Sequence, residues 1–236
     1  MKLLSEGISN PKIAKGMGQG FLPYILHLAP STISGYNVCP HASEGCKRVC
    51  LNFAGRGRFT SVQQARIRKT KLFFENRGEF MRLLVKDLDA AERKATKLGL
   101  KAVVRLNGTS DLNWLPVILK HPNIQFYDYT KNLKYVVAVK RRMGLGLHNY
   151  HLTFSLSETN EIQARAALSI ACNVAVVFRD SLPEMYMGYN VIDGTTTDLR
   201  FLDQQPVIVG LLAKGLAKKD QSGFVQSHEI ITKEAV

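Results

Sequence analysis

Three of the four cysteines of this chain lie within twelve residues, and this spacing constrains the fold more than any other feature. Cys39, Cys46 and Cys50 are separated by six and by three residues in the segment NVCPHASEGCKRVCLNFAGRGR, residues 37–58. One proline and three glycines interrupt regular structure in this segment, so the backbone can bring the three sulfurs around one point. The segment therefore predicts a metal site.

The intervals favour an iron–sulfur cluster over zinc. Structural zinc sites usually pair their ligands closely within a compact module, whereas iron–sulfur clusters accept irregular cysteine intervals and a distant fourth ligand. Cys172 is the only remaining cysteine, so we expect it to be that ligand and to close the cluster. Without it, one iron stays open for substrate or cofactor. Two other interpretations remain: zinc, and a metal-free segment of buried thiols or a disulfide.

At 236 residues and 45% hydrophobic content, the chain is long enough for one sizeable core. We expect a single domain over residues 1–236, made of a loop-rich cysteine segment (1–58), a helical segment (59–100) and a βα segment (101–236). No apolar run reaches the roughly 18 residues of a membrane span, and the first ten residues are unlike a signal peptide. Cysteines without a paired framework indicate a reducing compartment, so we expect a cytoplasmic protein.

Positive charge is the second strong feature of the chain. A net charge of +13 and a pI near 9.7 are typical of proteins that contact a polyanion. The cations concentrate in residues 56–77 and 120–142, each with a single acidic residue. Contact with DNA or RNA is one interpretation and solvated helix faces are the other, because no sequence-reading motif accompanies the charge. The candidate nucleic-acid-binding residues are Arg56, Arg58, Arg66, Arg68, Lys69 and Lys71.

The order of helical and extended patterns predicts an α/β fold. Residues 1–36 are rich in glycine and proline, with at most a short strand over 24–28. Thr60 or Ser61 is expected to cap a helix that runs to about Glu75, and Asn76 a second helix that ends at Gly99. Six β-rich runs follow, at 102–106, 124–127, 151–155, 174–178, 189–192 and 207–209, with helices at 112–119, 133–143 and 161–170 between the first four.

This alternation predicts a partial (βα) barrel of about six mostly parallel strands, preceded by the cysteine-rich loop and two helices. Ligands of such folds bind at the carboxyl ends of the strands, where this chain carries polar residues that turn chemistry or helix capping also explains. Cys172 lies at the amino end of the strand over 174–178, whereas a ligand site is expected at the carboxyl ends. Its position therefore disagrees with its assignment as the fourth ligand, which rests on the number of cysteines. The candidate cofactor- or substrate-binding residues are Arg105, Asn107, Asp111, Lys131, Ser155, Arg179 and Asp193.

Four stretches carry a resemblance to a known family. CPHASEGCKRVC with the following LNFAGRG, and then VVRLNGTSDL and QFYDYTKN, resemble the bacteriophage gene-product-88 type over about residues 35–210. The resemblance implies a phage origin and hence the host cytoplasm, a 4Fe–4S cluster held by Cys39, Cys46 and Cys50, and a partial barrel similar to that of radical S-adenosylmethionine enzymes. S-adenosylmethionine is then a candidate cofactor, although those enzymes most often carry their three cysteines at shorter intervals. The resemblance implies no particular reaction.

Three functions follow from these observations. The first is a phage iron–sulfur protein with a radical-enzyme-like barrel that acts on or beside nucleic acid. The second is a nucleic-acid-binding module whose cluster or zinc ion is purely structural. The third is a small-molecule redox enzyme whose charge serves only to keep it soluble. The sequence identifies neither the substrate nor the oligomeric state.

Overall fold

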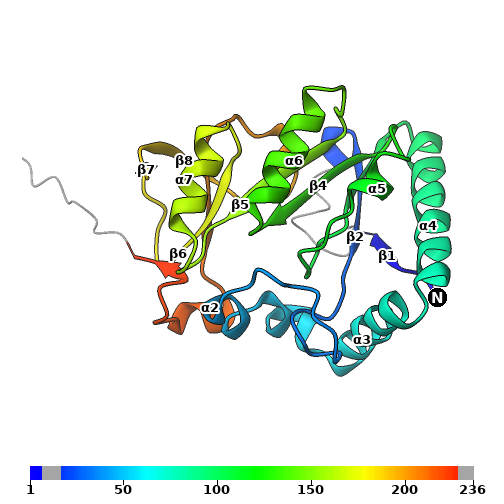
Figure 1. The fold of residues 1–236 in the computed structure, drawn as a ribbon, viewed down its shortest axis with the longest axis horizontal. Coiled ribbons are helices and arrows are strands. Elements are labelled where there is room, and N and C mark those ends of the chain that lie inside the picture. Colours follow the sequence, from blue (N-terminus) through cyan, green and yellow to red (C-terminus); the bar gives the residue numbers. More distant parts are fainter. Residues whose placement is uncertain (7–16, 228–236) are drawn as a thin grey trace, which may run out of the picture.

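The computed structural model describes residues 1–6 and 17–227 and shows a mixed α/β fold around one open, ten-stranded sheet (Figure 1). The strand order is β1-β2-β3-β4-β5-β6-β9-β8-β7, with β10 beside β6. The strands from β2 to β8 in this order run parallel, while β1 and β7 are antiparallel to their neighbours β2 and β8. The strands are β1 (Leu4–Glu6), β2 (Phe21–Leu26), β3 (Lys101–Arg105), β4 (Gln125–Thr130), β5 (Tyr150–Ser155), β6 (Val174–Phe178), β7 (Met185–Tyr186), β8 (Tyr189–Asp193), β9 (Ile208–Leu212) and β10 (Val225–Gln226).

The six predicted β-rich runs are all strands, but the predicted number of about six strands is too low. β1, β7 and β10 have only two or three residues, too few for a period of two to be recognised. β2 contains Pro23, a residue typical of edge strands, and yet it pairs with β3 along five residues. Pro23 is tolerated because β1 pairs only with residues 24–26. The order ends at β1 and β7, so the described part of the chain forms an open sheet, and barrel character is not confirmed.

The helices agree closely with the periodicity of the sequence. Asn76 caps α4 through its side chain, which accepts a hydrogen bond from Glu79 N at 3.1 Å, and Gly99 follows the helix with φ 65°. The cap predicted for α3 is wrong, because Phe59 occupies that position without a side-chain hydrogen bond. The helices are α2 (Glu44–Arg48), α3 (Thr60–Glu75), α4 (Arg77–Lys97), α5 (Leu115–Ile118), α6 (Leu133–Met143) and α7 (Glu161–Ser169), with 3-10 turns η2 (Met17–Gln19), η3 (Leu51–Phe53), η4 (Gly55–Arg58), η5 (Arg200–Leu202) and η6 (Gly215–Lys219).

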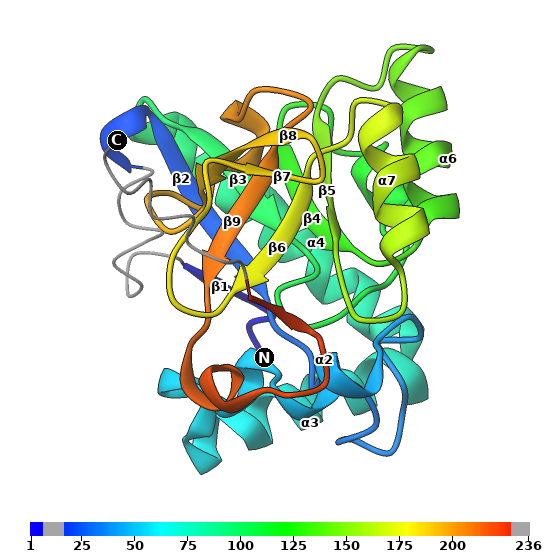
Figure 2. The same ribbon diagram turned by 90° about the vertical axis from the view of Figure 1, so that its left-hand side faces the viewer.

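The main core lies between the sheet and the helices α4, α6 and α7. Phe80 and Leu84 of α4 are fully buried in it, together with the sheet residues Val104, Phe126 and Phe154. Each such side chain contributes roughly 1.5–3 kcal/mol by leaving water. Figure 2 shows α6 and α7 together on one side of the sheet, while α2 and α3 lie below it. The core thus holds the parallel strands rigidly and leaves their carboxyl ends to face the cysteine segment.

The carboxyl ends of β5 and β6 are not paired with each other. β5 pairs only with Val174 and Ala175 at the start of β6, whereas β10 pairs with Val177 and Phe178 at its end. The C-terminal segment, residues 213–227, therefore enters the sheet at the carboxyl edge, beside the end of β6 that extends beyond the last residue of β5. This arrangement brings the end of the described chain to the same edge as the cysteine segment.

Two further expectations concern membrane-spanning helices and the N-terminal loop. No helix in residues 1–6 and 17–227 combines the length and the apolar character that a membrane span requires. The loop structure expected for residues 1–36 falls partly on residues 7–16, which lie outside the described residues.

Candidate functional site

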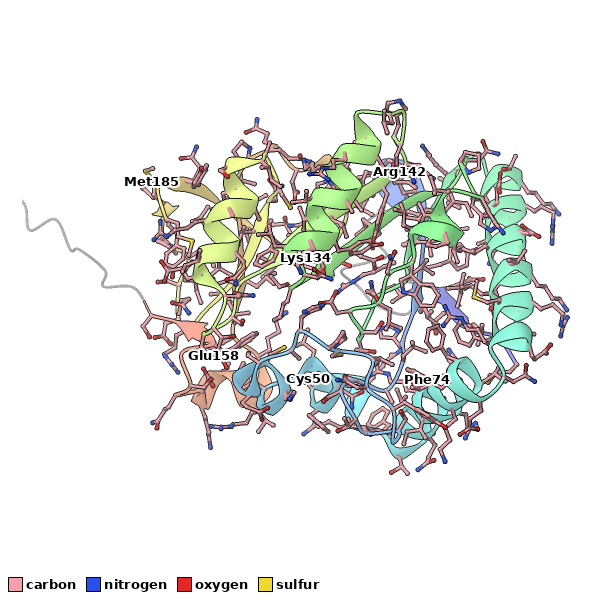
Figure 3. All side chains as sticks on the ribbon, in the orientation of Figure 1. Cys50, Phe74, Lys134, Arg142, Glu158 and Met185 are labelled. Atoms are coloured by element: carbon pink, nitrogen blue, oxygen red, sulfur yellow. The ribbon has the colours of Figure 1, made fainter. Side chains whose placement is uncertain are left out.

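The cysteine loop, residues 37–58, lies against the carboxyl ends of β3 and β5. The Cys39 thiol donates to the backbone oxygen of Thr109, 3.7 Å away in the loop after β3. The carboxylate of Glu158, in the loop after β5, accepts two hydrogen bonds from the middle of the cysteine loop. Figure 3 shows Cys50 and Glu158 below the sheet, on the side where the strands end. The structure therefore places the cysteines at the edge where parallel βα folds bind their ligands.

Glu158 positions the short helix that carries Cys46. One carboxylate oxygen, Oε2, accepts from the Ser43 hydroxyl at 2.7 Å, and the other, Oε1, accepts from the Gly45 backbone N–H at 2.7 Å. Ser43 is the N-cap of α2, and its Oγ accepts from the backbone N–H of Cys46 at 3.2 Å. A Cβ atom at Gly45 would come within 2.7 Å of Glu158 Oε1, so a larger residue there would displace the carboxylate from this position. Cys46 is thus tied to the sheet through Ser43 and Glu158.

The thiols of Cys39, Cys46 and Cys50 share one environment. All three are free and half-buried. Burial raises the pKa of Cys39 to about 11, and the neighbouring thiols of Cys50 and Cys46 act in the same direction. Burial also raises the pKa of Cys50, and Cys46 again adds to the increase. Thiols that repel one another's negative charge lie close together, and a bound metal would stabilise their thiolate forms.

Two cations lie near Cys50. Arg66 of α3 and Lys131, which follows β4, both oppose the rise in the pKa of Cys50. The Arg66 guanidinium donates through Nη1 to the side-chain oxygen of the buried Asn52. The ammonium group of Lys131 lies 5.6 Å from the centroid of the Phe224 ring, in the C-terminal segment. These cations supply positive charge where thiolates would carry negative charge.

Asp111 joins the loops after β3 and β4 to the cysteine loop. Its Oδ1 accepts from the Thr130 hydroxyl at 2.7 Å, and its Oδ2 accepts from the Lys131 backbone N–H at 2.9 Å. Its own backbone N–H donates to the carbonyl oxygen of Val38 at 2.8 Å, next to Cys39. Both carboxylate oxygens are used in this way, so Asp111 builds the site's framework.

The donor set of the cysteine loop consists of three thiols. In the described ranges, no three His, Cys, Asp or Glu side chains are placed so that they could hold one metal ion. A zinc ion needs its ligand atoms to converge on one point. An iron–sulfur cluster is held by thiolates, the donor type that Cys39, Cys46 and Cys50 would supply.

Cys172 lies outside this site, contrary to our prediction that it is the fourth ligand. It is buried at the amino end of β6, and its thiol donates to the carbonyl oxygen of Leu152 at 3.3 Å. Phe178, at the other end of the strand, lies six positions after Cys172, which corresponds to about 20 Å of extended chain. Burial raises the pKa of Cys172 to about 11, as expected for a thiol that packs in the core.

The remaining predicted ligand-binding residues fall into different places. Asn107 lies at the cysteine edge, where its side-chain oxygen accepts from Ser110, Leu112 and Trp114 and thereby shapes the loop after β3. Arg105 instead forms an ion pair with Asp198 at 3.3 Å and lies 4.5 Å from the centroid of the Tyr129 ring.

Three further predicted residues form hydrogen bonds that hold loops or the C-terminal segment in place. The Ser155 carbonyl oxygen accepts from the Asn160 side chain at 3.0 Å. Arg179 donates to the backbone oxygens of Lys218 and Asp220, at 3.1 and 2.7 Å, and so fastens the C-terminal segment. Asp193 accepts from Thr195 in an exposed turn after β8.

The predicted nucleic-acid-binding residues do not form one surface. Arg56, Arg58, Arg68 and Lys71 are exposed. Lys69 is buried, with its ammonium group bonded to the carbonyl oxygen of Leu3, and Arg66 points towards the cysteine site. The prediction treated all cations of α3 as members of one polar face, but Lys69 lies buried against Leu3, the residue before β1, and does not belong to that face.

Sequence reasoning missed the residues that support the cysteine loop. Ser43 stands three residues before Cys46, and this capping spacing is a local signal that could have identified it. Asn52 and Glu158 offered no comparable signal, because their partners Arg66 and Gly45 become neighbours only in the folded chain.

A family model described as "Gene product 88" matches residues 2–228 of the chain. The matched range contains all ten strands of the sheet, the cysteine loop and Glu158. In two further comparisons, no curated protein and no solved structure matches the chain.

Proposed function

This chain belongs to the gene product 88 family, and we propose that it is an iron–sulfur protein that holds a 4Fe–4S cluster through Cys39, Cys46 and Cys50. One observation carries the proposal: three free, half-buried thiols are grouped at the carboxyl edge of a parallel sheet, where burial, and then the neighbouring thiols, raise the pKa of Cys39 and of Cys50. When bound, a cluster held by three thiolates supplies one-electron chemistry and leaves one iron able to take a further ligand.

The surrounding residues have separate tasks in this proposal. Arg66 and Lys131 offset the negative charge of the cluster and its thiolates. Glu158 holds the helix α2, and with it Cys46, against the sheet. Asp111 keeps the loop that touches Cys39 in register with β4. Hydrogen bonds and charges of this kind around a cluster set its stability and its reduction potential.

The proposal extends to S-adenosylmethionine as the small molecule at the open iron, in the manner of a radical S-adenosylmethionine enzyme. The parallel strands and the position of the cysteine loop at their carboxyl edge support this extension. The cations Arg66 and Lys131 are suited to the carboxylate of such a ligand.

Anaerobic purification with iron and sulfide analysis tests the cluster. We expect brown protein whose iron is lost on replacement of Cys39, Cys46 or Cys50 by alanine. Cys172→Ala is the matched control, since it removes a thiol that lies away from the site, and it should retain the iron. Stoichiometric zinc without iron, or full iron retention by Cys46→Ala, would overturn the proposal. A change in the spectrum on addition of S-adenosylmethionine tests the open iron separately.

We also propose that the protein acts on or beside nucleic acid in the cytoplasm of the host cell. The net charge of +13 and the exposure of Arg56, Arg58, Arg68 and Lys71 support this part of the proposal. Binding to a nucleic acid should weaken with salt, with a log–log slope of about −0.7 to −0.9 for each phosphate contacted. Binding that is absent at about 50 mM salt, or that does not respond to salt, would contradict it.

A further inference from the structure

Four large apolar side chains are exposed on a surface just beyond Cys50. Leu51 (66% exposed) and Phe53 (38%) belong to η3, Phe59 (58%) follows η4, and Leu216 (54%) belongs to η6. The turns η3 and η6 are in contact although they come from opposite ends of the chain. Figure 2 shows the C-terminal segment, in orange, beside the cyan helices below the sheet. We call residues 51–59 and 214–219 the phenylalanine surface.

The two phenylalanine rings of this surface have no aromatic partner in the described part of the chain. Phe74 shows the contrast, because it is also exposed but stacks on Tyr36 with ring centroids 4.5 Å apart and an interplanar angle of 5°. Exposed apolar side chains that gather in one place usually mark a binding surface. Phe53 and Phe59 therefore present ring surface for a partner.

The charge of the phenylalanine surface indicates the kind of partner. Arg56 and Arg58 stand between the two phenylalanines, and Lys214, Lys218 and Lys219 flank Leu216; all five are exposed. Neither residues 51–74 nor residues 204–219 contain an aspartate or glutamate. The surface therefore combines apolar rings with several cations and has no acidic residue within its own segments. A partner must offer negative charge together with flat apolar groups.

We propose that the phenylalanine surface binds single-stranded DNA. Base stacking on aromatic side chains beside a cationic track is the general mode by which single strands are held. A duplex offers the phosphates but keeps its base faces covered, so it would leave Phe53 and Phe59 unused. The rings and cationic side chains of the surface offer no acceptor for the proton of a ribose 2′-hydroxyl, and this favours the deoxy strand.

The inference rests on the proposed function, since it names the partner of the same site. Cys50 immediately precedes η3, so a base stacked on Phe53 lies next to the cysteine loop. The strand would thereby be presented to whatever chemistry the cysteine site performs. The turns of the surface contact one another, η3 with both η4 and η6, through residues that are not proposed cluster ligands.

Fluorescence anisotropy of a labelled oligo-dT of about 20 nucleotides, with the full chain under anaerobic conditions, tests the proposal. We expect Phe53→Ala and Phe59→Ala each to weaken binding about tenfold while leaving the salt slope unchanged. The double variant Arg56→Ala, Arg58→Ala should weaken binding and flatten the slope by about 1.4, since each phosphate contact to a single strand contributes about 0.7.

Matched controls lie on the distant side of the molecule. Leu145→Ala removes an apolar side chain that is 81% exposed, and Arg141→Ala with Arg142→Ala removes two exposed cations of α6. Figure 3 shows Arg142 at the opposite end of the structure from Cys50. These variants should bind oligo-dT with nearly unchanged affinity. Circular dichroism of each variant verifies that it is folded.

Three results would overturn the proposal: equal losses in the control variants, tighter binding of oligo-rU or of duplex DNA than of oligo-dT, or full affinity in both phenylalanine variants. The Cys46→Ala protein tests DNA binding by the phenylalanine surface independently of the proposed cluster. Retained oligo-dT binding by cluster-free Cys46→Ala supports the phenylalanine surface whether or not the wild-type chain holds iron. A brown protein that does not bind oligo-dT would refute the surface and leave the cluster intact.

Discussion

Replacing Glu158 by alanine should release the part of the cysteine loop that carries Cys46. The change removes two hydrogen bonds from a half-buried carboxylate, to Ser43 Oγ and to Gly45 N, each 2.7 Å long. Hydrogen bonds to charged groups contribute about 1.5–3 kcal/mol each, and we take the lower end because Glu158 is only half-buried. The sum of about 3 kcal/mol corresponds to roughly a 150-fold increase in local opening of the loop.

Hydrogen exchange measures this opening directly and needs no bound metal. In Glu158→Ala, the backbone amides of residues 43–50 should exchange about 100-fold faster than in the wild type, whereas those of α4 stay protected. If the cluster is present, its iron should also be lost more readily during desalting. Glu158→Gln should fall between the two, because its amide oxygen can still accept from Gly45.

Glu44→Ala is the control for charge. It removes an equal charge, from the helix α2 that Glu158 positions, but Glu44 is 80% exposed in its side chain and pairs only with Lys47 among the cations of the described residues. Exposed pairs contribute little, so the exchange of residues 43–50 should hardly change. Equal exchange rates in Glu158→Ala and Glu44→Ala would refute the assignment of Glu158 as the residue that positions the loop.

Three further changes test other parts of the structure. Burial raises the pKa of Asp128 from 3.8 to about 7, so between these pH values the folded state holds a proton that the unfolded state has lost. The free energy of unfolding should therefore fall by about 4 kcal/mol as the pH rises from about 4 to about 7. Asp128→Asn should lose this dependence in urea unfolding at pH 5 and pH 8; the same dependence in both proteins would contradict it. Lys69→Met should cost about 2 kcal/mol in the same assay, because it removes a hydrogen bond from a buried ammonium group to Leu3, while oligo-dT binding stays unchanged. A loss of DNA binding without a loss of stability would show that Lys69 contacts DNA and is not buried. Gly45→Ala should destabilise the protein by about 1–3 kcal/mol, because the added methyl group meets Glu158 and Ser222, and wild-type stability would show that the two segments are not in contact.

Much of the fold could be predicted because its signals are local. The apolar spacing of α4, the capping by Asn76 and the glycine after the helix lie within one stretch of the chain, so the helix was predicted to within a few residues. The six β-rich runs were found for the same reason. The strands β1, β7 and β10 carry too few residues for any local pattern, and they exist only because longer strands offer them a free edge or a gap.

The sequence by itself determined that Cys39, Cys46 and Cys50 would be neighbours, because all three lie within twelve residues and the ends of so short a segment stay close together. Only the tertiary structure decided what surrounds them. Cys172 was assigned by counting, yet the length of β6 holds it away from the site. Glu158 reaches the loop because β5 ends beside it, which no spacing along the chain encodes. Local conformation follows from neighbouring residues, whereas contacts between distant segments follow from the packing of the whole sheet against its helices.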